Sequence, residues 1–371
     1  MPMMPAQETV PAQRGCGIHG TTMAAAAAAL LLSAPLGMVV DPAAPAVRLS
    51  RILPMMPAVS PEAAAERVVQ FAADVGPSQL AWVPSSDVFT GDAEAVRSVE
   101  RLAFLAGGSQ WAWTEGGAPP QQLQPAAAAP VETHAVSAPA ELAAVGGGEV
   151  WARDLDAGGL APVISVAGAD GAGGFLALSS GRFLLASGGG RLLLLEQDEG
   201  LEGLGGIGGR PPEWQALELL PDGALGGPLR SLCVSSTEDE LFFAAGGAVL
   251  RAPLTAEARL AASPEPFVST APSDAAALAT DAQRNLYVCV DEGVRVFDEQ
   301  GEESLVITTP APATGVCFGR FGGSSLSTLF VGAADSIWAL PTQVQGAEAS
   351  RSFRFLKQIE KQVQAQRHEN W

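Results

Sequence analysis

The chain has 371 residues and a net charge of −19, and 47% of its residues are hydrophobic. This length allows two average domains or one large all-β domain, and the hydrophobic fraction is normal for a globular protein with a sizeable core. The acidic balance argues against nucleic acids and anionic membranes as partners, because both require clustered Lys and Arg.

The first part of the chain, residues 1–59, is predicted to be a low-complexity leader. It contains only two acidic residues, Glu8 and Asp41, and an apolar run over 23–40 that is too interrupted for a stable membrane span. Such a segment suits targeting to an organelle (plastid or mitochondrion) or to the secretory pathway. The alternative is a disordered Ala/Pro leader without a targeting role.

A short helix is predicted over residues 60–76. Ser60 is a good N-cap, Pro61 suits the first helical position, and Gly76 ends the run. Val68 and Val69 contribute to an apolar face. The helix is expected to precede the main domain.

Residues 77–346 are predicted to be strands separated by turns. The chain contains 42 Gly and 28 Pro, which favours many turns over long helices. Similar units recur at a spacing of about 40–50 residues, the period of a β-propeller blade. The units begin near Leu102, Leu142, Leu176, Leu232, Leu278 and Val316. The predicted fold is therefore all-β, a six-bladed β-propeller in which each sheet covers its neighbours.

The fifth unit has the clearest pattern of strands and turns. "LYVCV" over 286–290 precedes a turn at 291–293, and "VRVF" over 294–297 precedes a second turn at 298–301. Alternating β-branched and aromatic residues between Gly- and Asp-containing turns predict an antiparallel hairpin.

The cysteines and histidines do not form a motif that indicates a metal or a triad. Cys233, Cys289 and Cys317 lie in apolar strand-like runs and are predicted to be buried free thiols, and no CxxC pair supports a zinc site. His134 lies in a Pro/Ala-rich segment, where an exposed loop histidine is favoured over a member of a Ser-His-Asp triad.

The C-terminal tail, residues 347–371, is predicted to be a basic amphipathic helix. Ile359 and Val363 follow helical spacing, and Lys357 and Lys361 flank Glu360. On an acidic body such a helix is expected to dock onto its own propeller, with binding of a protein partner as the alternative.

Three stretches of the sequence resemble a known family, two of them whole blades and the third the short exit PTQVQG over 341–346 that follows the last blade. "ALATDAQRNLYVCVDEGVRVFD" over 277–298 and "TGVCFGRFGGSSLSTLFVGAADSIWAL" over 314–340 are similar to blades of the gluconolactonase, regucalcin and luciferin-regenerating-enzyme group of six-bladed propellers. The resemblance implies a divalent cation, usually calcium, on the central axis. It also implies hydrolysis of a small-molecule lactone or ester, in which the cation polarises the carbonyl and a carboxylate activates water.

The same resemblance assigns the cation's ligands to particular positions. The glutamate of the first blade corresponds to Glu100, in "ERLAF". The first asparagine position corresponds to Gly173, with Asp170 nearby, and the second corresponds to Arg230.

The aspartate that serves as ligand and presumed base corresponds to Ala276, and Asp274 lies two residues upstream. Two hypotheses stay open. In the first, the metal site is degenerate, a Glu100–Arg230 ion pair replaces the cation, and the propeller binds a ligand or a protein. In the second, Glu100, Asp274 and Asp170 hold calcium and Asp274 is the catalytic base of a lactone or ester hydrolase.

Overall fold

The computed structural model describes residues 46–49, 65–71 and, with gaps in several loops, 76–347. Its elements are all strands, and six of its sheets contain four or five antiparallel strands. These are called the first to sixth sheets in the chain order of their innermost strands. From the innermost strand outward, the first sheet consists of β3 (Ser78–Val83), β6 (Arg101–Ala106), β7 (Ser109–Trp113) and β8 (Gln121–Gln122). The second sheet consists of β9 (Thr133–Ser137), β10 (Glu141–Gly146), β11 (Glu149–Arg153) and β12 (Leu160–Ser165). The third sheet consists of β13 (Gly174–Ala177), β14 (Phe183–Ala186), β15 (Leu192–Gln197) and β16 (Trp214–Leu220).

The other three sheets follow the same order. The fourth sheet consists of β17 (Leu229–Val234), β18 (Glu240–Ala245), β19 (Ala248–Pro253) and β20 (Glu265–Ser269). The fifth sheet consists of β21 (Leu278–Thr280), β22 (Leu286–Val290), β23 (Gly293–Phe297), β24 (Glu303–Thr308) and β1 (Ala46–Leu49). The sixth sheet consists of β25 (Ala313–Gly319), β26 (Thr328–Ala333), β27 (Ser336–Pro341) and β2 (Glu66–Gln70). A separate two-stranded hairpin, β4 (Asp87–Val88) and β5 (Val96–Arg97), is inserted between β3 and β6.

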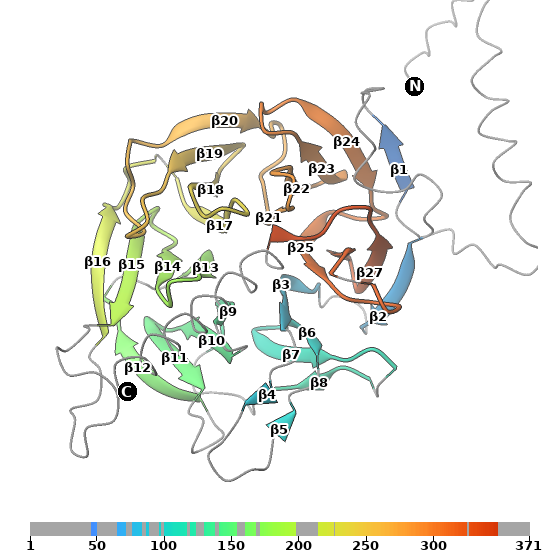
Figure 1. Cartoon of the computed structure of the whole chain (residues 1–371), viewed down its shortest axis with the longest axis horizontal. Helices are drawn as coiled ribbons and strands as arrows, with labels where there is room; N and C mark the ends of the chain where they lie inside the picture. Colours follow the sequence, from blue (N-terminus) through green and yellow to red (C-terminus); the bar gives the residue numbers. More distant parts are fainter. Residues whose placement is uncertain are drawn as a thin grey trace, which may run out of the picture. The chain divides into compact units, whose positions relative to one another are not determined.

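The innermost strands form a closed ring, as Figure 1 shows. Contacts run from β3 to β9, β13, β17, β21 and β25, and β25 returns to β3. The fold is therefore an all-β propeller. Its ring closes through β2, which comes from the N-terminal side of the chain and pairs with β27.

Apolar side chains between neighbouring sheets hold the ring together. Tyr287 of the fifth sheet packs edge-on against Phe318 of the sixth, with ring centroids 5.1 Å apart. Trp82 of the first sheet stacks on Phe330 of the sixth at 5.6 Å. Because both faces of these sheets are covered, their strands are apolar on both sides, which explains runs such as 286–290.

The predicted hairpin of the fifth sheet is confirmed. β22 and β23 occupy 286–290 and 293–297, and the turn between them depends on Gly293. Gly293 has φ 135°, and a Cβ there would lie 2.1 Å from the carbonyl oxygen of Ile307. The predicted burial of Cys233, Cys289 and Cys317 is also confirmed.

The predicted helix over 60–76 is wrong where it can be compared. Residues 66–70 form strand β2, because the edge of β27 offers backbone partners that outweigh the local helix signals. The leader prediction needs a similar correction, since Ala46–Leu49 is a strand paired with β24. The rest of the leader and the tail from residue 348 lie outside the described residues. In the described part of the chain, no helix is long and apolar enough to cross a membrane.

The first two repeat units were predicted one strand out of phase. Leu102 lies in β6 and Leu142 in β10, which are the second strands of their sheets. The innermost strands are β3 and β9 instead. The units near Leu176, Leu232, Leu278 and Val316 begin in innermost strands, as predicted.

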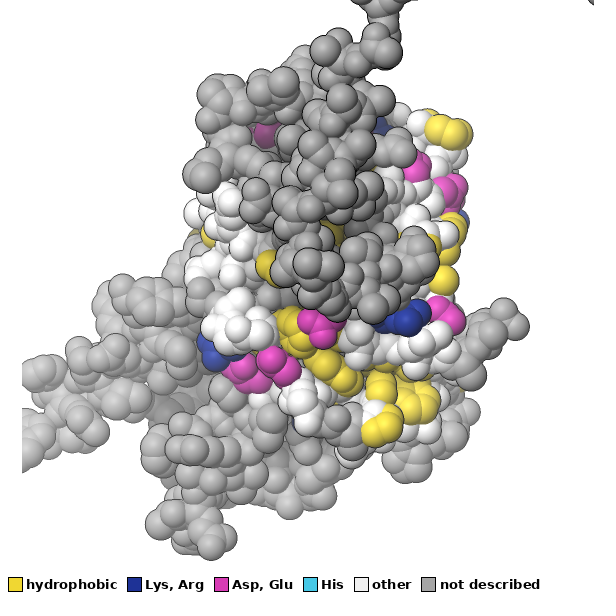
Figure 2. All heavy atoms as spheres, turned by 90° about the vertical axis from the view of Figure 1, so that its right-hand side faces the viewer, with side chains coloured by type: hydrophobic (Ala, Val, Ile, Leu, Met, Phe, Trp, Pro, Cys, Tyr) yellow, Lys and Arg dark blue, Asp and Glu magenta, His cyan; other side chains and the backbone are white. Residues whose placement is uncertain are grey.

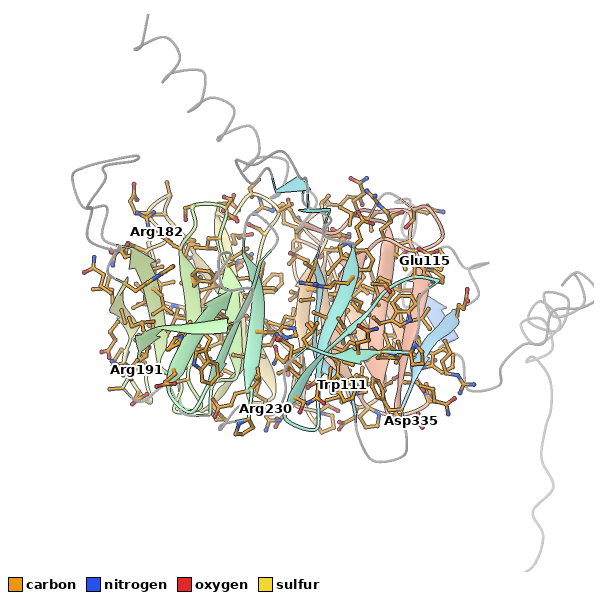
Figure 3. All side chains as sticks on the ribbon, turned by 90° about the horizontal axis from the view of Figure 1, so that it is seen from below. Trp111, Glu115, Arg182, Arg191, Arg230 and Asp335 are labelled. Atoms are coloured by element: carbon orange, nitrogen blue, oxygen red, sulfur yellow. The ribbon has the colours of Figure 1, made fainter. Side chains whose placement is uncertain are left out.

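The ring has two faces, separated in Figure 3 by their labelled residues. The innermost strands begin at the face that carries Arg230, Arg191 and Asp335, which we call the entry face. They end at the face that carries Arg182 and Glu115, which we call the exit face.

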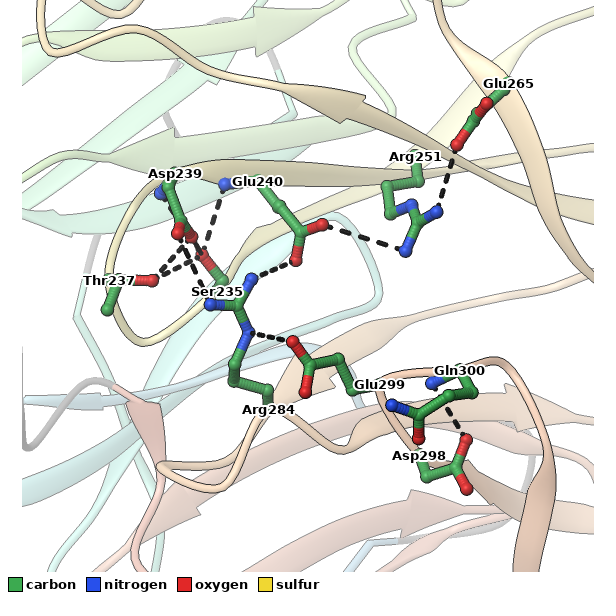
Figure 4. Close-up of polar contacts among 10 residues, drawn as sticks. All are labelled: Ser235, Thr237, Asp239, Glu240, Arg251, Glu265, Arg284, Asp298, Glu299 and Gln300. Atoms are coloured by element: carbon green, nitrogen blue, oxygen red, sulfur yellow. Dashed lines mark hydrogen bonds and ion pairs between the residues drawn. The ribbon is translucent and has the colours of Figure 1, made fainter.

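An ion-pair network centred on Arg284, in the turn after β21, joins the fourth and fifth sheets (Figure 4). Arg284 lies 2.5 Å from Glu240, 3.3 Å from Asp239 and 3.4 Å from Glu299. Glu240 is shared with Arg251 at 3.7 Å. One guanidinium thus connects acids from both sheets.

We expect Arg284→Ala to lower the free energy of unfolding by roughly 1–2 kcal/mol, because it leaves three carboxylates without their shared cation. The loss should shrink at high salt. Urea denaturation at two salt concentrations measures it. Arg191→Ala is the control, since Arg191 pairs with one exposed acid, Glu218; its loss should stay below about 1 kcal/mol. Equal losses for the two variants would contradict the network's role.

Candidate functional site

The positions assigned by the family resemblance gather at the entry face. Gly173 directly precedes β13, Arg230 is the second residue of β17, and Asp274 and Ala276 precede β21. These innermost strands are consecutive around the ring. The structure therefore brings together four of the six predicted site residues on one side of the axis.

Arg230 and Asp274 form an ion pair. The Arg230 Nη2 lies 3.0 Å from the Asp274 Oδ2, and both side chains are about half exposed, at 50% and 48%. Arg230 is the only Arg or Lys in the described residues of the six innermost strands. The carboxylate predicted as metal ligand and base is thus held by a cation that cannot lose its proton.

Glu100 lies at the opposite end of the ring. It precedes β6, which runs antiparallel to β3, so it lies at the exit face. Its Oε1 pairs with the Arg320 Nη1 at 3.0 Å, and Arg320 follows the end of β25. The predicted Glu100–Arg230 pair is therefore not formed. The error follows from taking the second strand of the first sheet for its innermost strand.

Gly173 has no room for a side chain. A Cβ at this position would lie 1.8 Å from the carbonyl oxygen of Leu229 and 2.9 Å from the Cα of Arg230. Ala276 is partly buried, and its amide donates to the carbonyl of Cys289 at 2.9 Å. Neither position supplies a side-chain oxygen. Asp170 lies outside the described residues.

Gln79 was missed by the sequence analysis. It lies in a bulge of β3 with φ 49°, an unusual conformation for a residue other than glycine. Its Nε2 donates to the carbonyl of Gly173 at 3.1 Å, and the Thr133 hydroxyl donates weakly to its Oε1 at 3.5 Å. Since Gly173 directly precedes β13 of the third sheet, the Gln79 side chain reaches past the second sheet. No sequence signal marks this residue, because backbone conformation decides its position.

Two ionisable residues, Glu132 just before β9 and His134 within it, make side-chain hydrogen bonds at the start of the second sheet. The Oε2 of Glu132 accepts from the amide of Ala172 at 2.8 Å. His134 is buried, which contradicts the predicted exposed loop, and its Nδ1 accepts from the Gln110 side-chain amide at 3.2 Å.

Burial lowers the pKa of His134 to about 4, against an opposing contribution from the backbone of Gln79. The imidazole is therefore neutral near pH 7.

The described residues do not suit a calcium ion. Calcium takes six to eight oxygen ligands, whereas Asp274 is paired with Arg230 and position 173 admits no side chain. No group of three or more His, Cys, Asp or Glu side chains that could hold a metal occurs in the part of the chain that the structure describes. The arrangement instead offers a half-exposed guanidinium beside a half-exposed carboxylate.

Comparison with known proteins identifies the fold. No family model matches the sequence, and no curated protein matches it either. A gluconolactonase from Xanthomonas campestris is 18% identical with a TM-score of 0.55, and the match covers 82% of this chain and 99% of that one.

Two further solved structures match similarly. A calcium-binding protein, regucalcin, from Agrobacterium tumefaciens and a luciferin-regenerating enzyme are each 14% identical with a TM-score of 0.54. Each match covers 76% of this chain and 97% of the other. The chain therefore has the propeller fold of gluconolactonase, regucalcin and luciferin-regenerating-enzyme structures.

Proposed function

We propose that the chain is a six-bladed propeller that binds a small ligand at its entry face without a metal ion. The Arg230–Asp274 ion pair carries this proposal. A cation bound at Asp274 would have to displace a guanidinium that is tethered to the neighbouring strand. A ligand carboxylate, in contrast, is attracted to the same guanidinium, whose planar fork matches a carboxylate.

The half-exposed state of Arg230 favours this role. A fully buried ion pair would serve the fold alone, whereas half of this side chain remains accessible to a ligand. Gln79, which bonds to Gly173 across the second sheet, would limit how deeply a ligand enters between the innermost strands. A small hydroxy-carboxylate that stays near the surface fits these features.

The competing function is a calcium-dependent lactone or ester hydrolase, which the fold shared with gluconolactonase structures favours. Calorimetric titration with calcium and a gluconolactone assay on the full chain test it. We expect neither calcium binding nor turnover in the wild type. Lactonase activity that a chelator abolishes would overturn the metal-free proposal. The Arg230→Asn, Ala276→Asp double variant introduces the asparagine and the aspartate that the family resemblance places at these positions. It tests whether a calcium site can be restored.

Binding itself is tested with gluconate as the probe. We expect gluconate to bind the wild type, and Arg230→Gln to weaken binding by about tenfold or more, since a charged hydrogen bond contributes about 1.5–3 kcal/mol. Arg191→Gln, which changes another arginine of the entry face, should leave the affinity unchanged. Equal affinities of the wild type and Arg230→Gln would show that Arg230 does not hold the ligand.

A further inference from the structure

The fifth sheet differs from the other five in having an extra outer strand. β1 pairs antiparallel with β24, with Ala46 opposite Thr308, Val47 opposite Ile307, Arg48 opposite Val306 and Leu49 opposite Leu305. In the other five sheets, as far as the structure describes them, the fourth strand is the outermost. The extra strand comes from the N-terminal side of the chain, before the strand β2 that closes the ring.

Without β1, the outer edge of β24 would be an open edge. Such an edge presents a row of unpaired N–H and C=O groups to which another extended segment can pair. The core fixes β24 in place, since Leu305 and Ile307 are 2% and 0% exposed. The edge is therefore a preformed acceptor whose geometry does not depend on β1.

The segment that covers this edge is suited to leave it. β1 has four residues, and 16 residues separate its end at Leu49 from the start of β2 at Glu66. As the outermost strand it pairs with β24 alone, through few ladder hydrogen bonds, each with a net value of about 1 kcal/mol. Such an edge strand opens more readily than the core of the sheet.

The segment nevertheless belongs to the propeller unit, which begins at Ala43. On the side of the unit that carries β1 and β24 in Figure 1, the visible described side chains include hydrophobic groups beside acidic and basic ones (Figure 2).

We propose that the outer edge of β24 is a strand-accepting interaction site whose occupant is the chain's own segment 46–49, bound reversibly. The recognised chemistry is an extended backbone with three aliphatic residues and one arginine, here Ala-Val-Arg-Leu. Displacement of this segment exposes the edge to another peptide of the same kind. The site is independent of the entry face, and of whether a metal or ligand binds there.

The test uses the full chain with proline placed in β1. Adjacent residues of a strand direct their N–H groups to opposite sides, so one of residues 47 and 48 donates toward β24. Because proline has no N–H, the Val47→Pro, Arg48→Pro double variant removes this donor whichever of the two residues supplies it. Ala43→Pro with Ala44→Pro is the matched control outside the strand. Hydrogen exchange of the backbone amides of 303–308 reports on the edge.

We expect exchange over 303–308 to become at least about tenfold faster in the strand variant and to stay unchanged in the control. A fluorescent peptide with the sequence of residues 43–52 should bind the strand variant and not the wild type, whose edge is already occupied. The Val47→Gly, Leu49→Gly double variant weakens the strand without introducing proline. It should also exchange faster over 303–308 and bind the peptide.

Three results would overturn the proposal. Equal exchange in the wild type, both strand variants and the control would mean that β1 does not cover the edge. Failure of the peptide to bind either strand variant would mean that the edge does not accept a strand in trans. A wild-type dimer in light scattering that becomes a monomer in the strand variants would assign the occupant to a second copy, which would also overturn the assignment within one chain.

Discussion

Replacing Asp281 with alanine is expected to lower the free energy of unfolding by about 3–4 kcal/mol, because buried donors lose their acceptor. The Asp281 side chain is fully buried in the turn that follows β21. It accepts from the amides of Gln283 and Asn285 at 2.8 and 2.9 Å, from the Asn285 Nδ2 at 2.7 Å and from the Tyr287 hydroxyl at 3.1 Å. Urea denaturation measures the loss.

The same sheet supplies a control for this substitution. Asp298 accepts from the amides of Gln300 and Glu302 at 3.0 and 2.9 Å in an exposed turn. Water can replace the carboxylate there, so Asp298→Ala should cost no more than about 1 kcal/mol. Equal losses for the two variants would show that burial does not set the value of the Asp281 contacts.

The pH dependence gives a second measurement on the same variant. Burial raises the pKa of Asp281, although the hydrogen bonds from Asn285, Gln283 and Tyr287 oppose the shift. Since the folded pKa is raised, the folded state retains the proton over an interval in which the unfolded chain has lost it. Stability from this group is therefore fully present below the unfolded pKa and is lost as pH rises through the folded pKa. Asp281→Ala should remove this part of the pH dependence.

Gly173→Ala is expected to lower the free energy of unfolding by about 3 kcal/mol. Its Cβ would lie 1.8 Å from the Leu229 carbonyl oxygen, so the backbone of β13 or β17 must move. Because Arg230 follows Leu229, the movement should also reduce gluconate binding if the proposed site is correct. Thermal unfolding and the binding assay measure the two effects.

Gly227 is the matched control for this prediction. A Cβ at Gly227 would meet no atom within 4 Å, and its φ lies outside the left-handed region. Gly227→Ala should therefore change stability by no more than about 0.5 kcal/mol, or raise it slightly. A Gly173→Ala variant as stable as Gly227→Ala would mean that the third and fourth sheets approach each other less closely than the structure shows.

The later part of the fold could be predicted from the sequence because its turns have strong signals. Gly293 and Asp298 mark the ends of regular hairpins in the fifth sheet, and the units from Leu176 onward are in phase with the structure. The first sheet was misassigned for a topological reason. The inserted hairpin β4–β5 separates β3 from β6, so the innermost strand lies apart from the strands that define the repeat.

The candidate site could be predicted only in part. Its location followed from the positions near Arg230 and Asp274, which the structure pairs. Glu100 was assigned to the wrong face because the direction of its strand was wrong, and a sequence pattern does not give strand direction. Gln79 could not be found at all, since its role depends on a bulge and a positive φ.

The pairing of β2 with β27 has a consequence for how the protein is made. Glu66 lies opposite Ala339, so the two partners that close the ring are separated by most of the chain. During synthesis from the N-terminus, β2 leaves the ribosome long before its partner exists, and its edge stays without a neighbour in the meantime. The loop-closure entropy of this long-range contact must be overcome before the ring gains its last interface. Ring closure therefore waits until β27 has been synthesised, and the open arc of sheets is the form of the nascent chain that a chaperone would meet.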